Sequence, residues 1–427
     1  MTLVTLAVAA IFSLLAVTQR NAGVAFGLLV MSVLIWPEFL RVPIAIIQMS
    51  VPRFVAIVLL FKYVAGGRGR TNGRSDVDRL VLSVWVWTVV ASVLAGAEFS
   101  QTSQMIGRGL DTVLMYYVAR MALSTDADMK GFYRVLAATA MLMCVLGVYE
   151  AITWKSPYHR FVDVAARIQG YSEIRFGMLR AQGSAQNSIY FGLAMSVILG
   201  MVWSFRGYTV SRTIGHLIAL SALMAALSSL SSGPWLAVAA LAVFNFYYQK
   251  VHWIKPTLWL LLVLATIVEV ASNRHFYQLI DYLALDPHTA WYRTRLLEIA
   301  VSQWRDYWLV GVGSDWPHHW AGLLDGRQYI DVVNNFVIIA LYGGAPALVL
   351  FVSGHVVAIK MAVKRLNGEI KVERRMIVFG LAATLLAIDF ASLSVGLFGP
   401  SLLLSHIVLG LLVSLSKPVP QDLREVS

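Results

Sequence analysis

Long apolar runs separated by polar connections extend from the first residues of the chain to its last line. About 20 apolar residues cross the roughly 30 Å hydrocarbon core of a bilayer as a helix. Pro37, Pro43 and Pro52 interrupt the pattern of the first three runs, so a broken or tilted pair of helices is an alternative there. The pattern predicts about twelve or thirteen transmembrane helices, over residues 3–18, 22–40, 49–65, 80–96, 105–122, 135–153, 188–205, 214–231, 234–248, 257–272, 334–362, 376–396 and 400–416.

The composition agrees with this pattern, because 58% of the 427 residues are hydrophobic and 13% are charged. Soluble chains carry about 25% charged residues. The expected fold is therefore an all-α, polytopic integral membrane protein. Cys144, the single cysteine, has no partner for an intrachain disulfide and is expected to be a small core residue. The first apolar run lacks a basic segment before it, so it is interpreted as the first span and not as a removed signal peptide.

The net charge of +11 reflects where lysine and arginine gather along the chain, and it does not indicate a nucleic-acid partner. Basic connections alternate with connections poor in Lys and Arg, and the positive-inside rule places the basic ones in the cytoplasm. Two long connections then fall outside. The predicted organisation is an N-terminal transmembrane bundle (1–153), a first long loop (154–187), central helices (188–272), a second long loop with a surface helix (273–333), and C-terminal helices with a cytoplasmic tail (334–427).

Both long outer loops are basic, which is unusual for outer loops and indicates a functional site. An alternative is that they hold anionic lipid headgroups. The second loop contains an amphipathic stretch beginning near Ala290, and then a turn with Gly311 and Gly313 that can expose backbone N–H groups. Asn334 and Asn335 follow at the start of a span, where they can cap the helix or contact a sugar.

Four segments carry a resemblance to a known family. RTRLLEIAVSQWRDYWLVGVG (293–313), VVNNFVIIALYGG (332–344), LRAQGSAQNSIYFG (179–192) and the serine-rich SLSSGPWLAVAA (229–240) are similar to the shared domain of the O-antigen ligase and O-antigen or exopolysaccharide polymerase superfamily. The arginine often found in the last segment is missing. The resemblance covers roughly 179–347 and rests on the order and spacing of the set. It implies a GT-C-like membrane glycosyltransferase that acts at the periplasmic face of the bacterial inner membrane on a glycan carried by polyprenyl diphosphate.

Arginines are the expected contacts of such a substrate, because a diphosphate leaving group needs fixed, bidentate positive charge as the sugar C1–O bond breaks. Arg180, Arg293 and Arg295 are the candidates, and an ion pair with Glu298 or Glu173 is the alternative for any one of them. The base for the acceptor hydroxyl could be Asp331, His318 or His319, or no side chain at all. The predicted catalytic set is Arg180, Arg293, Arg295 and Asp331, and the predicted substrate-binding set is Asn187, Tyr292, Trp304, Gly311, Gly313, His318, His319, Asn334 and Asn335.

Two further observations concern the type of transferase and its use of a metal ion or cofactor. Ligases of the family usually carry a histidine just before the Asn that opens the span, and Val333 stands there, which favours a polymerase. The outer loops contain no convincing group of metal ligands, so neither metal nor cofactor is expected. Trp291, Tyr292, Trp304, Trp308, Trp316 and Trp320 could stack on sugar rings or anchor the loop at the interface.

The predicted reaction transfers a growing chain from polyprenyl diphosphate to the non-reducing end of the next lipid-linked repeat, with inversion at the anomeric carbon. Membrane lipid, a chain-length regulator and a flippase are the other expected partners. An O-antigen ligase that accepts lipid A core is one alternative. A lipid-linked oligosaccharide flippase or other transporter is the alternative of another class. The ionisable residues predicted within spans do not suggest the midplane grouping that a proton-coupled transporter needs; they are Glu150, Glu269, His355, Asp389 and His406.

Overall fold

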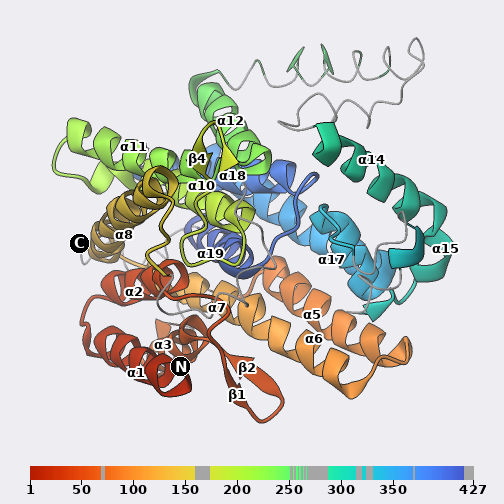
Figure 1. Cartoon of the computed structure of the whole chain (residues 1–427). Helices are drawn as coiled ribbons and strands as arrows, with labels where there is room; N and C mark the ends of the chain where they lie inside the picture. The colour runs from red at the N-terminus through yellow and green to blue at the C-terminus, as the bar shows by residue number, and fades with distance from the viewer. Residues whose placement is uncertain are drawn as a thin grey trace.

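The computed structural model of the protein is a bundle of helices with two very small β-hairpins (Figure 1). It describes residues 1–68, 73–158, 174–250, 287–313, 320–323, 330–368 and 371–417, with single positions between 253 and 266. The α-helices are α1 (Thr2–Thr18), α2 (Ala22–Ile35), α3 (Val51–Ala65), α5 (Asp76–Leu94), α6 (Phe99–Asp111), α7 (Val113–Ala122), α8 (Asp126–Thr153), α10 (Ser188–Phe205), α11 (Arg212–Ser228), α12 (Ser232–Phe246), α14 (Pro287–Ser302), α15 (Trp304–Tyr307), α17 (Asn335–Leu366), α18 (Val372–Ala391) and α19 (Gly399–Leu415). Short 3₁₀ helices are η2 (Arg206–Tyr208), η3 (Tyr247–Gln249) and η7 (Ala321–Leu323), and the strands are β1 (Val42–Ile44), β2 (Ile47–Met49), β3 (Ile174–Arg175) and β4 (Met178–Leu179).

The prediction of an all-α chain with membrane-spanning helices is confirmed at this level. Four described helices are long and apolar enough to cross a bilayer: Asp76–Leu94, Asp126–Thr153, Ser188–Tyr208 and Asn335–Leu366. Five further apolar helices are shorter. Each predicted run coincides with a described helix except 257–272, most of which lies outside the described residues, and 105–122, which is divided between α6 and α7 at Thr112.

The proline-rich segment between the second and third runs forms a connection and not a broken helix. Pro37 follows the end of α2, Pro43 lies in β1, and Pro52 occupies the first turn of α3, where its missing N–H leaves no helical bond unmade. β1 and β2 pair antiparallel, with Val42 opposite Met49. The alternative of a broken pair is therefore wrong, because each proline lies where a helix has already ended or is just beginning. The tilt of these helices in a membrane stays a prediction.

Helices α10 and α19 form the centre of the bundle. Every residue of α19 from Pro400 to Leu415 is buried. Figure 1 shows α10 and α19 between α1–α3 on one side and α11 and α12 on the other. The loops that connect the helices lie at two opposite ends of the bundle.

One of these ends, which we call the Arg120 end, is held by ion pairs between basic and acidic residues of the short connections. Arg120 Nε lies 2.9 Å from Asp78 Oδ1, and Arg68 Nη1 lies 3.0 Å from Asp128 Oδ2. The Asn21 amide donates to the carbonyl oxygen of Ala127 at 2.9 Å. Three of the basic segments expected in the cytoplasm begin or end here: 66–79, the stretch around Lys130 and Arg134, and 206–212. The structure therefore brings these three segments to one end.

The opposite end, which we call the Arg180 end, gathers the loops that carry the resemblance. The Glu38 N–H donates to the Ser184 carbonyl oxygen at 3.2 Å, and Arg180 Nη2 donates to Ser231 Oγ at 2.8 Å. The Asn335 N–H donates to the Ser392 carbonyl oxygen at 2.9 Å. All candidate site residues within the described ranges belong to this end or to the segments packed beneath it.

Helix α17 is broken near its start, and the glycine turn of the second long loop is inserted at the break. Gly343 and Gly344 have non-helical dihedral angles, with Gly344 at φ 66° and ψ −167°. The Val312 N–H donates to the Leu341 carbonyl oxygen at 2.8 Å, and the Ala345 N–H donates to the Trp308 carbonyl oxygen at 2.6 Å. Backbone groups freed by the break are therefore satisfied by the turn, as a sharp kink in a spanning helix requires.

The ionisable residues within the bundle are more closely grouped than the sequence suggests. His355 Nε2 lies 3.7 Å from Asp389 Oδ1, and His355 and His406 line one cavity. These three residues come together because the helices that carry them, α17, α18 and α19, pack against one another. The expectation about a grouping at the membrane midplane stays a prediction. Glu269 lies outside the described residues.

Candidate functional site

Three arginines from two different segments converge on the turn that joins α11 to α12. This turn, Ser228–Ser232, contains four serines, and Leu230 adopts a left-handed conformation with φ 46°. Arg180 Nη2 donates to Ser231 Oγ at 2.8 Å, Arg175 Nη1 donates to the Leu230 carbonyl oxygen at 3.2 Å, and Arg293 Nη2 lies 3.4 Å from Ser232 Oγ. A non-glycine residue held in this conformation is strained, and such strain concentrates at functional sites. The serine turn therefore positions the arginines of both long loops.

The positive charge at the serine turn is largely removed from water. Arg180 is 8% exposed and Arg293 is 6% exposed. Within the described part of the chain, Arg293 forms no ion pair and its Nε has no hydrogen-bond acceptor. Burial, and secondarily the charge of Arg175, lowers the pKa of Arg293. A buried guanidinium beside a second one is costly unless an anion binds there, so this geometry fits an anionic ligand.

The loop that carries Arg180 is fixed from below by Glu150. This carboxylate, near the end of α8, is 2% exposed and accepts hydrogen bonds from the Gly183 N–H at 2.9 Å and the Gln182 N–H at 3.3 Å. Glu150 is therefore a buried carboxylate that the backbone of the Arg180 loop stabilises. Charge-assisted bonds of this kind contribute about 1.5–3 kcal/mol each, so Glu150 holds the loop in register with the serine turn.

Glu38 is a second carboxylate with a backbone partner at this end, half-buried, and no pattern in the sequence indicates it. Its Oε1 accepts from the Gln186 N–H at 3.1 Å, and its Oε2 lies against Gly399 at the start of α19. Burial raises the pKa of Glu38 to about 7, although the charge of Arg41 opposes the rise. The sequence signal was a lone acidic residue directly after Pro37, which by itself does not distinguish a buried carboxylate from a surface one.

The structure separates the two candidate arginines of α14. Arg293 points to the serine turn, whereas Arg295 Nη1 forms an ion pair with Glu298 Oε2 at 2.8 Å with 47% of its side chain exposed. Two residues along a helix are rotated by about 200°, so both side chains cannot face the same site. Arg295 occupies the ion pair that the sequence analysis gave as its alternative, and Arg293 is the arginine that belongs to the site.

Asp331 lies beside the site and is held by Tyr292. The Tyr292 hydroxyl donates to the Asp331 carbonyl oxygen and accepts from the Asp331 N–H, both at 3.0 Å. Burial raises the pKa of the Asp331 carboxyl group. A small cavity of about 10 Å³ is lined by Arg293, Val333 and Asn334, so Val333 lies beside the buried arginine.

The three candidate asparagines have structural partners. Asn187 caps α10 by accepting from the Ile189 N–H at 2.9 Å. Asn334 caps α17 by accepting from the N–H groups of Phe336 and Val337 at 3.0 and 3.1 Å. Asn335 is 2% exposed and accepts from the Leu397 N–H at 3.3 Å. Capping therefore accounts for Asn187 and Asn334, and their contacts with a sugar stay predictions.

The glycine turn is also engaged by the fold. The Gly311 N–H donates to the Tyr307 carbonyl oxygen at 3.1 Å, and a side chain at Gly311 would place Cβ 2.3 Å from the Leu341 carbonyl oxygen. Gly311 therefore serves docking on α17, and Gly313 lies beside Ala97 with φ 71°. Neither glycine has been shown to contact a substrate.

Aromatic side chains remain available on the outside of the second long loop. Trp291, Trp304 and Trp308 are 50%, 41% and 50% exposed, whereas Trp320 is 1% exposed and packs against Tyr307. Trp320 is therefore a core residue and cannot stack on a sugar or reach the interface. His318, His319 and Trp316 lie outside the described residues.

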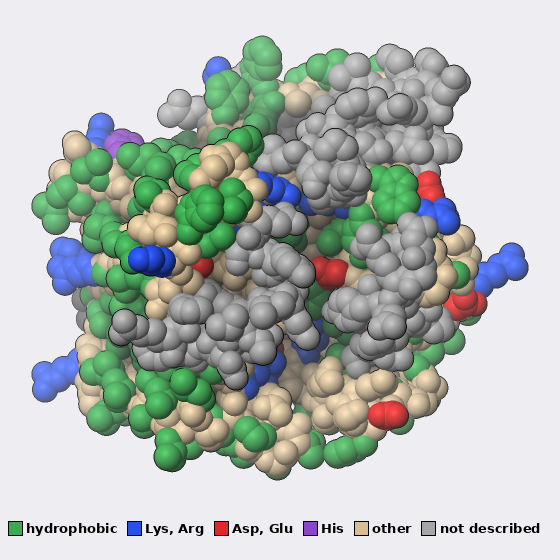
Figure 2. All heavy atoms as spheres, viewed as in Figure 1, with side chains coloured by type: hydrophobic (Ala, Val, Ile, Leu, Met, Phe, Trp, Pro, Cys, Tyr) green, Lys and Arg blue, Asp and Glu red, His purple; other side chains and the backbone are tan. Residues whose placement is uncertain are grey.

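Figure 2 views the molecule as in Figure 1, with β4 above its centre and the β1–β2 hairpin at the bottom. Lys and Arg side chains are visible in the hollow near its centre, beside Asp or Glu side chains. No family model and no curated protein sequence matches this chain. The resemblance to the ligase and polymerase superfamily therefore stays a hypothesis that rests on the motifs and on the geometry of the site.

Proposed function

We propose that this protein is an inverting membrane glycosyltransferase that polymerises polyprenyl-diphosphate-linked oligosaccharide repeats into a surface polysaccharide, an O-antigen or exopolysaccharide. The proposal places a GT-C-like fold in the bacterial inner membrane, with the Arg180 end toward the periplasm. The observation that carries it is the convergence of Arg175, Arg180 and Arg293 on the serine turn, where two of the guanidinium groups are almost completely buried.

The chemistry follows from this charge. When the bond between the sugar C1 and the diphosphate oxygen breaks, the electron pair leaves with the diphosphate and adds negative charge to it. Guanidinium groups that are already in place stabilise this charge without reorganisation, and more strongly in a dry site than in water. The acceptor hydroxyl forms the new bond to C1 from the opposite face and releases a proton. Asp331 directly precedes Val332, which lines the Arg293 cavity, and burial raises the pKa of its carboxyl group, which makes the carboxylate a stronger base.

Two alternatives are kept for testing. A ligase would transfer the glycan to lipid A core, and Val333 in the Arg293 cavity argues against it because ligases usually place histidine there. A flippase would move the substrate without chemistry, and the pairing of His355 with Asp389 inside the bundle is the observation that favours it. A chain-length regulator or a flippase is expected as a partner of a polymerase.

The decisive experiment uses the purified full-length protein in proteoliposomes with a synthetic polyprenyl-diphosphate-linked repeat as the only substrate. We expect products that are multiples of the repeat, still attached to diphosphate lipid, resolved by electrophoresis and mass spectrometry. Product formed only after lipid A core is added would replace the polymerase by a ligase. Movement of a fluorescent lipid-linked repeat between leaflets without any longer product would replace it by a flippase.

A further inference from the structure

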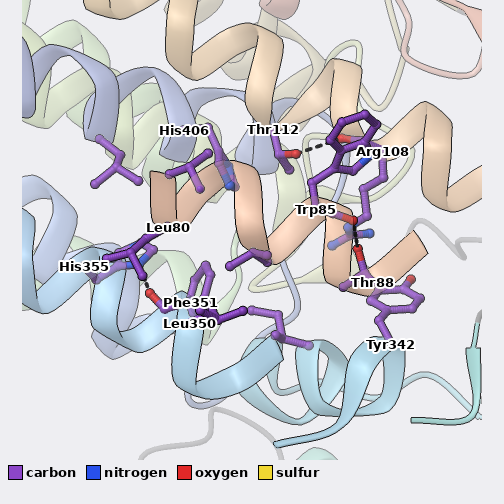
Figure 3. A pocket seen from close by; sticks show the side chains of 15 residues that line it. Leu80, Trp85, Thr88, Arg108, Thr112, Tyr342, Leu350, Phe351, His355 and His406 are labelled. Atoms are coloured by element: carbon purple, nitrogen blue, oxygen red, sulfur yellow. Dashed lines mark hydrogen bonds between the residues drawn. The ribbon is translucent and has the colours of Figure 1, made fainter. Parts of the chain in front are cut away.

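A second polar site lies inside the bundle, away from the serine turn. Helices α5, α6, α17 and α19 enclose a cavity of about 50 Å³ (Figure 3). Most of its lining is apolar, from residues such as Leu80, Val84, Leu350 and Phe351. At one end of the close-up, Arg108 lies between Trp85 and Tyr342, and His355 lies at the other end. By volume the cavity has room for roughly three or four water molecules, or for one tetrahedral oxyanion.

Arg108 is the unusual member of this lining. Its guanidinium carbon lies 4.6 Å from the centre of the Tyr342 ring, and within the described residues it has no hydrogen-bond acceptor and no carboxylate partner. The arginines of the neighbouring helices differ, because Arg53 pairs with Asp111 at 2.6 Å and Arg120 pairs with Asp78 at 2.9 Å. Ionisable groups inside a membrane bundle are costly and almost always paired. Arg108 can therefore bind an anion within the cavity.

The nearby acids do not provide that anion. Asp111 is bound by Arg53, and Asp389 lies 3.7 Å from His355. The other basic group that faces the cavity, His406, has its Nδ1 3.0 Å from the Leu402 carbonyl oxygen. Within the described residues, therefore, no acidic side chain neutralises the charge of Arg108.

The position of Arg108 fits a lipid headgroup and not a deep ion. Arg108 and Thr88 line the same end of the cavity, and Thr88 lies six residues before the end of α5 at Leu94, or about 9 Å along the helix. A guanidinium at this depth can reach phosphate near the interface while its stem stays in apolar surroundings.

This cavity and the Arg293 site contact different faces of α17. Val337 lines the small cavity with Arg293, whereas Ile339 and Tyr342 line the cavity with Arg108. Positions 337 and 339 are about 200° apart around a helix. Helix α17 and its glycine break therefore separate two sites that both present a buried or half-buried arginine.

We propose that the α5–α17 cavity binds a phosphate group of a membrane lipid headgroup, with the phosphate on Arg108. The lipid is either a polyprenyl diphosphate or an ordinary anionic phospholipid, which share this chemistry. If it is a polyprenyl diphosphate, the site holds the second lipid-linked substrate that a polymerase requires, and that reading rests on the proposed function.

The test is lipid binding to the purified full-length protein, measured by native mass spectrometry after delipidation and by titration of thermal stability. Polyprenyl diphosphate and phosphatidylglycerol are the two probes, and Arg293→Ala is the background in which the serine-turn site is disabled. In that background we expect Arg108→Ala to weaken binding of at least one probe by about tenfold or more, as loss of a charge-assisted contact to phosphate would. Arg79→Ala, at an exposed position of α5, is the matched control and leaves binding unchanged.

A second variant protects the test against misfolding. Gly354 and Leu80 both line the cavity, and a Cβ added at Gly354 would lie 3.7 Å from Leu80 Cβ, at ordinary contact distance. The larger side chain of Gly354→Leu therefore takes up cavity space without changing any charge. We expect it to weaken the same probe as Arg108→Ala does. Dependence on Arg108 for phosphatidylglycerol alone identifies a phospholipid site, and dependence for polyprenyl diphosphate identifies a substrate site, whether or not the protein forms polymer. Equal binding of both probes by the Arg108→Ala variant and its parent would overturn the proposal.

Discussion

Arg293 and Arg295 provide a matched pair, because they lie two residues apart in α14 and differ in environment. Arg293 is 6% exposed and contacts Ser232, whereas the Arg295 side chain is 47% exposed and pairs with Glu298. We expect Arg293→Lys to lower the rate of chain extension by about 10²-fold and Arg293→Ala by about 10³-fold. Removal of one preorganised donor from developing charge costs roughly 2.7–4 kcal/mol of transition-state stabilisation. The same changes at Arg295 should alter the rate by less than about threefold, since exposed ion pairs contribute about 0–1 kcal/mol.

Replacement of Arg293 by an apolar residue should lower the rate of chain extension without lowering the thermal stability of the protein. Within the described residues this guanidinium has no acidic partner and lies near Arg175, so folding includes the cost of its desolvation. Exchange of buried charges for apolar residues of similar volume is often neutral or stabilising by about 1–4 kcal/mol. Arg293→Met should therefore keep or raise the thermal unfolding temperature in detergent while chain extension is lost.

The assay is the proteoliposome reaction with lipid-linked repeats, normalised to the amount of inserted protein. Thermal unfolding is followed in parallel by the fluorescence of the protein eluting from a size-exclusion column. Activity of Arg293→Met close to that of the unchanged protein would refute the role of Arg293 in leaving-group stabilisation. A lower unfolding temperature together with lost activity would show instead that Arg293 is a structural residue.

Three further predictions concern the surroundings of the site. Gly311→Ala should destabilise the protein by roughly 2–3 kcal/mol, because the residue has φ 74° and its new Cβ would lie 2.3 Å from a carbonyl oxygen of α17. Gly313→Ala should cost only about 1 kcal/mol, because the residue has φ 71° but its nearest neighbour lies at 3.7 Å. Equal losses of thermal stability in the two variants would refute the docking of this turn on α17. Asp331→Asn should reduce the rate of chain extension by about 10²-fold or more and abolish the increase of this rate with pH. The reason is that a base must be deprotonated to act, and burial raises the pKa of the Asp331 carboxyl group. An unchanged pH profile would show that Asp331 is not the base. Burial raises the pKa of Glu38 from 4.5 to about 7. Between these two pH values the folded state keeps a proton on Glu38 that the unfolded state has released, so the free energy of unfolding decreases as the pH rises from 4.5 to 7. Glu38→Gln should remove this loss, at most about 3 kcal/mol, and unfold at a higher temperature than the unchanged protein at pH 8 but not at pH 4.5; a constant difference between these pH values would contradict the assignment.

Much of the fold could be predicted from the sequence because its signals are local. The run 188–205 and helix α10 share their first and last residues, and the run 400–416 differs from α19 by one residue at each end. Asn187, at the start of α10, also has the conformation that its residue type favours. The β1–β2 hairpin was not predicted, since three-residue strands around a turn have no periodicity that separates them from a loop.

The candidate site was predicted only in part. The two long basic loops and the serine-rich segment were recognised from residue types, and Arg180 and Arg293 were among the candidates. The sequence could not decide between Arg293 and Arg295, because the spacing to the glycine turn favours Arg293 whereas the flanking residues favour Arg295. Glu38, Glu150 and Arg175 entered the site through contacts with segments distant in the sequence, which a single sequence does not encode in any short pattern.

The sequence by itself determined that this chain is helical, that its spans are suited to a bilayer, and that its unusual charge is concentrated in two loops. These properties follow from the length of apolar runs and from residue composition, and each is decided within a few turns of helix. The tertiary structure alone decided which arginines lose contact with water, that a strained serine turn gathers them, and that Arg108 faces a cavity without an acidic partner in the described chain. Desolvation and charge pairing depend on what the fold brings alongside each group, and those neighbours come from helices far apart in the sequence.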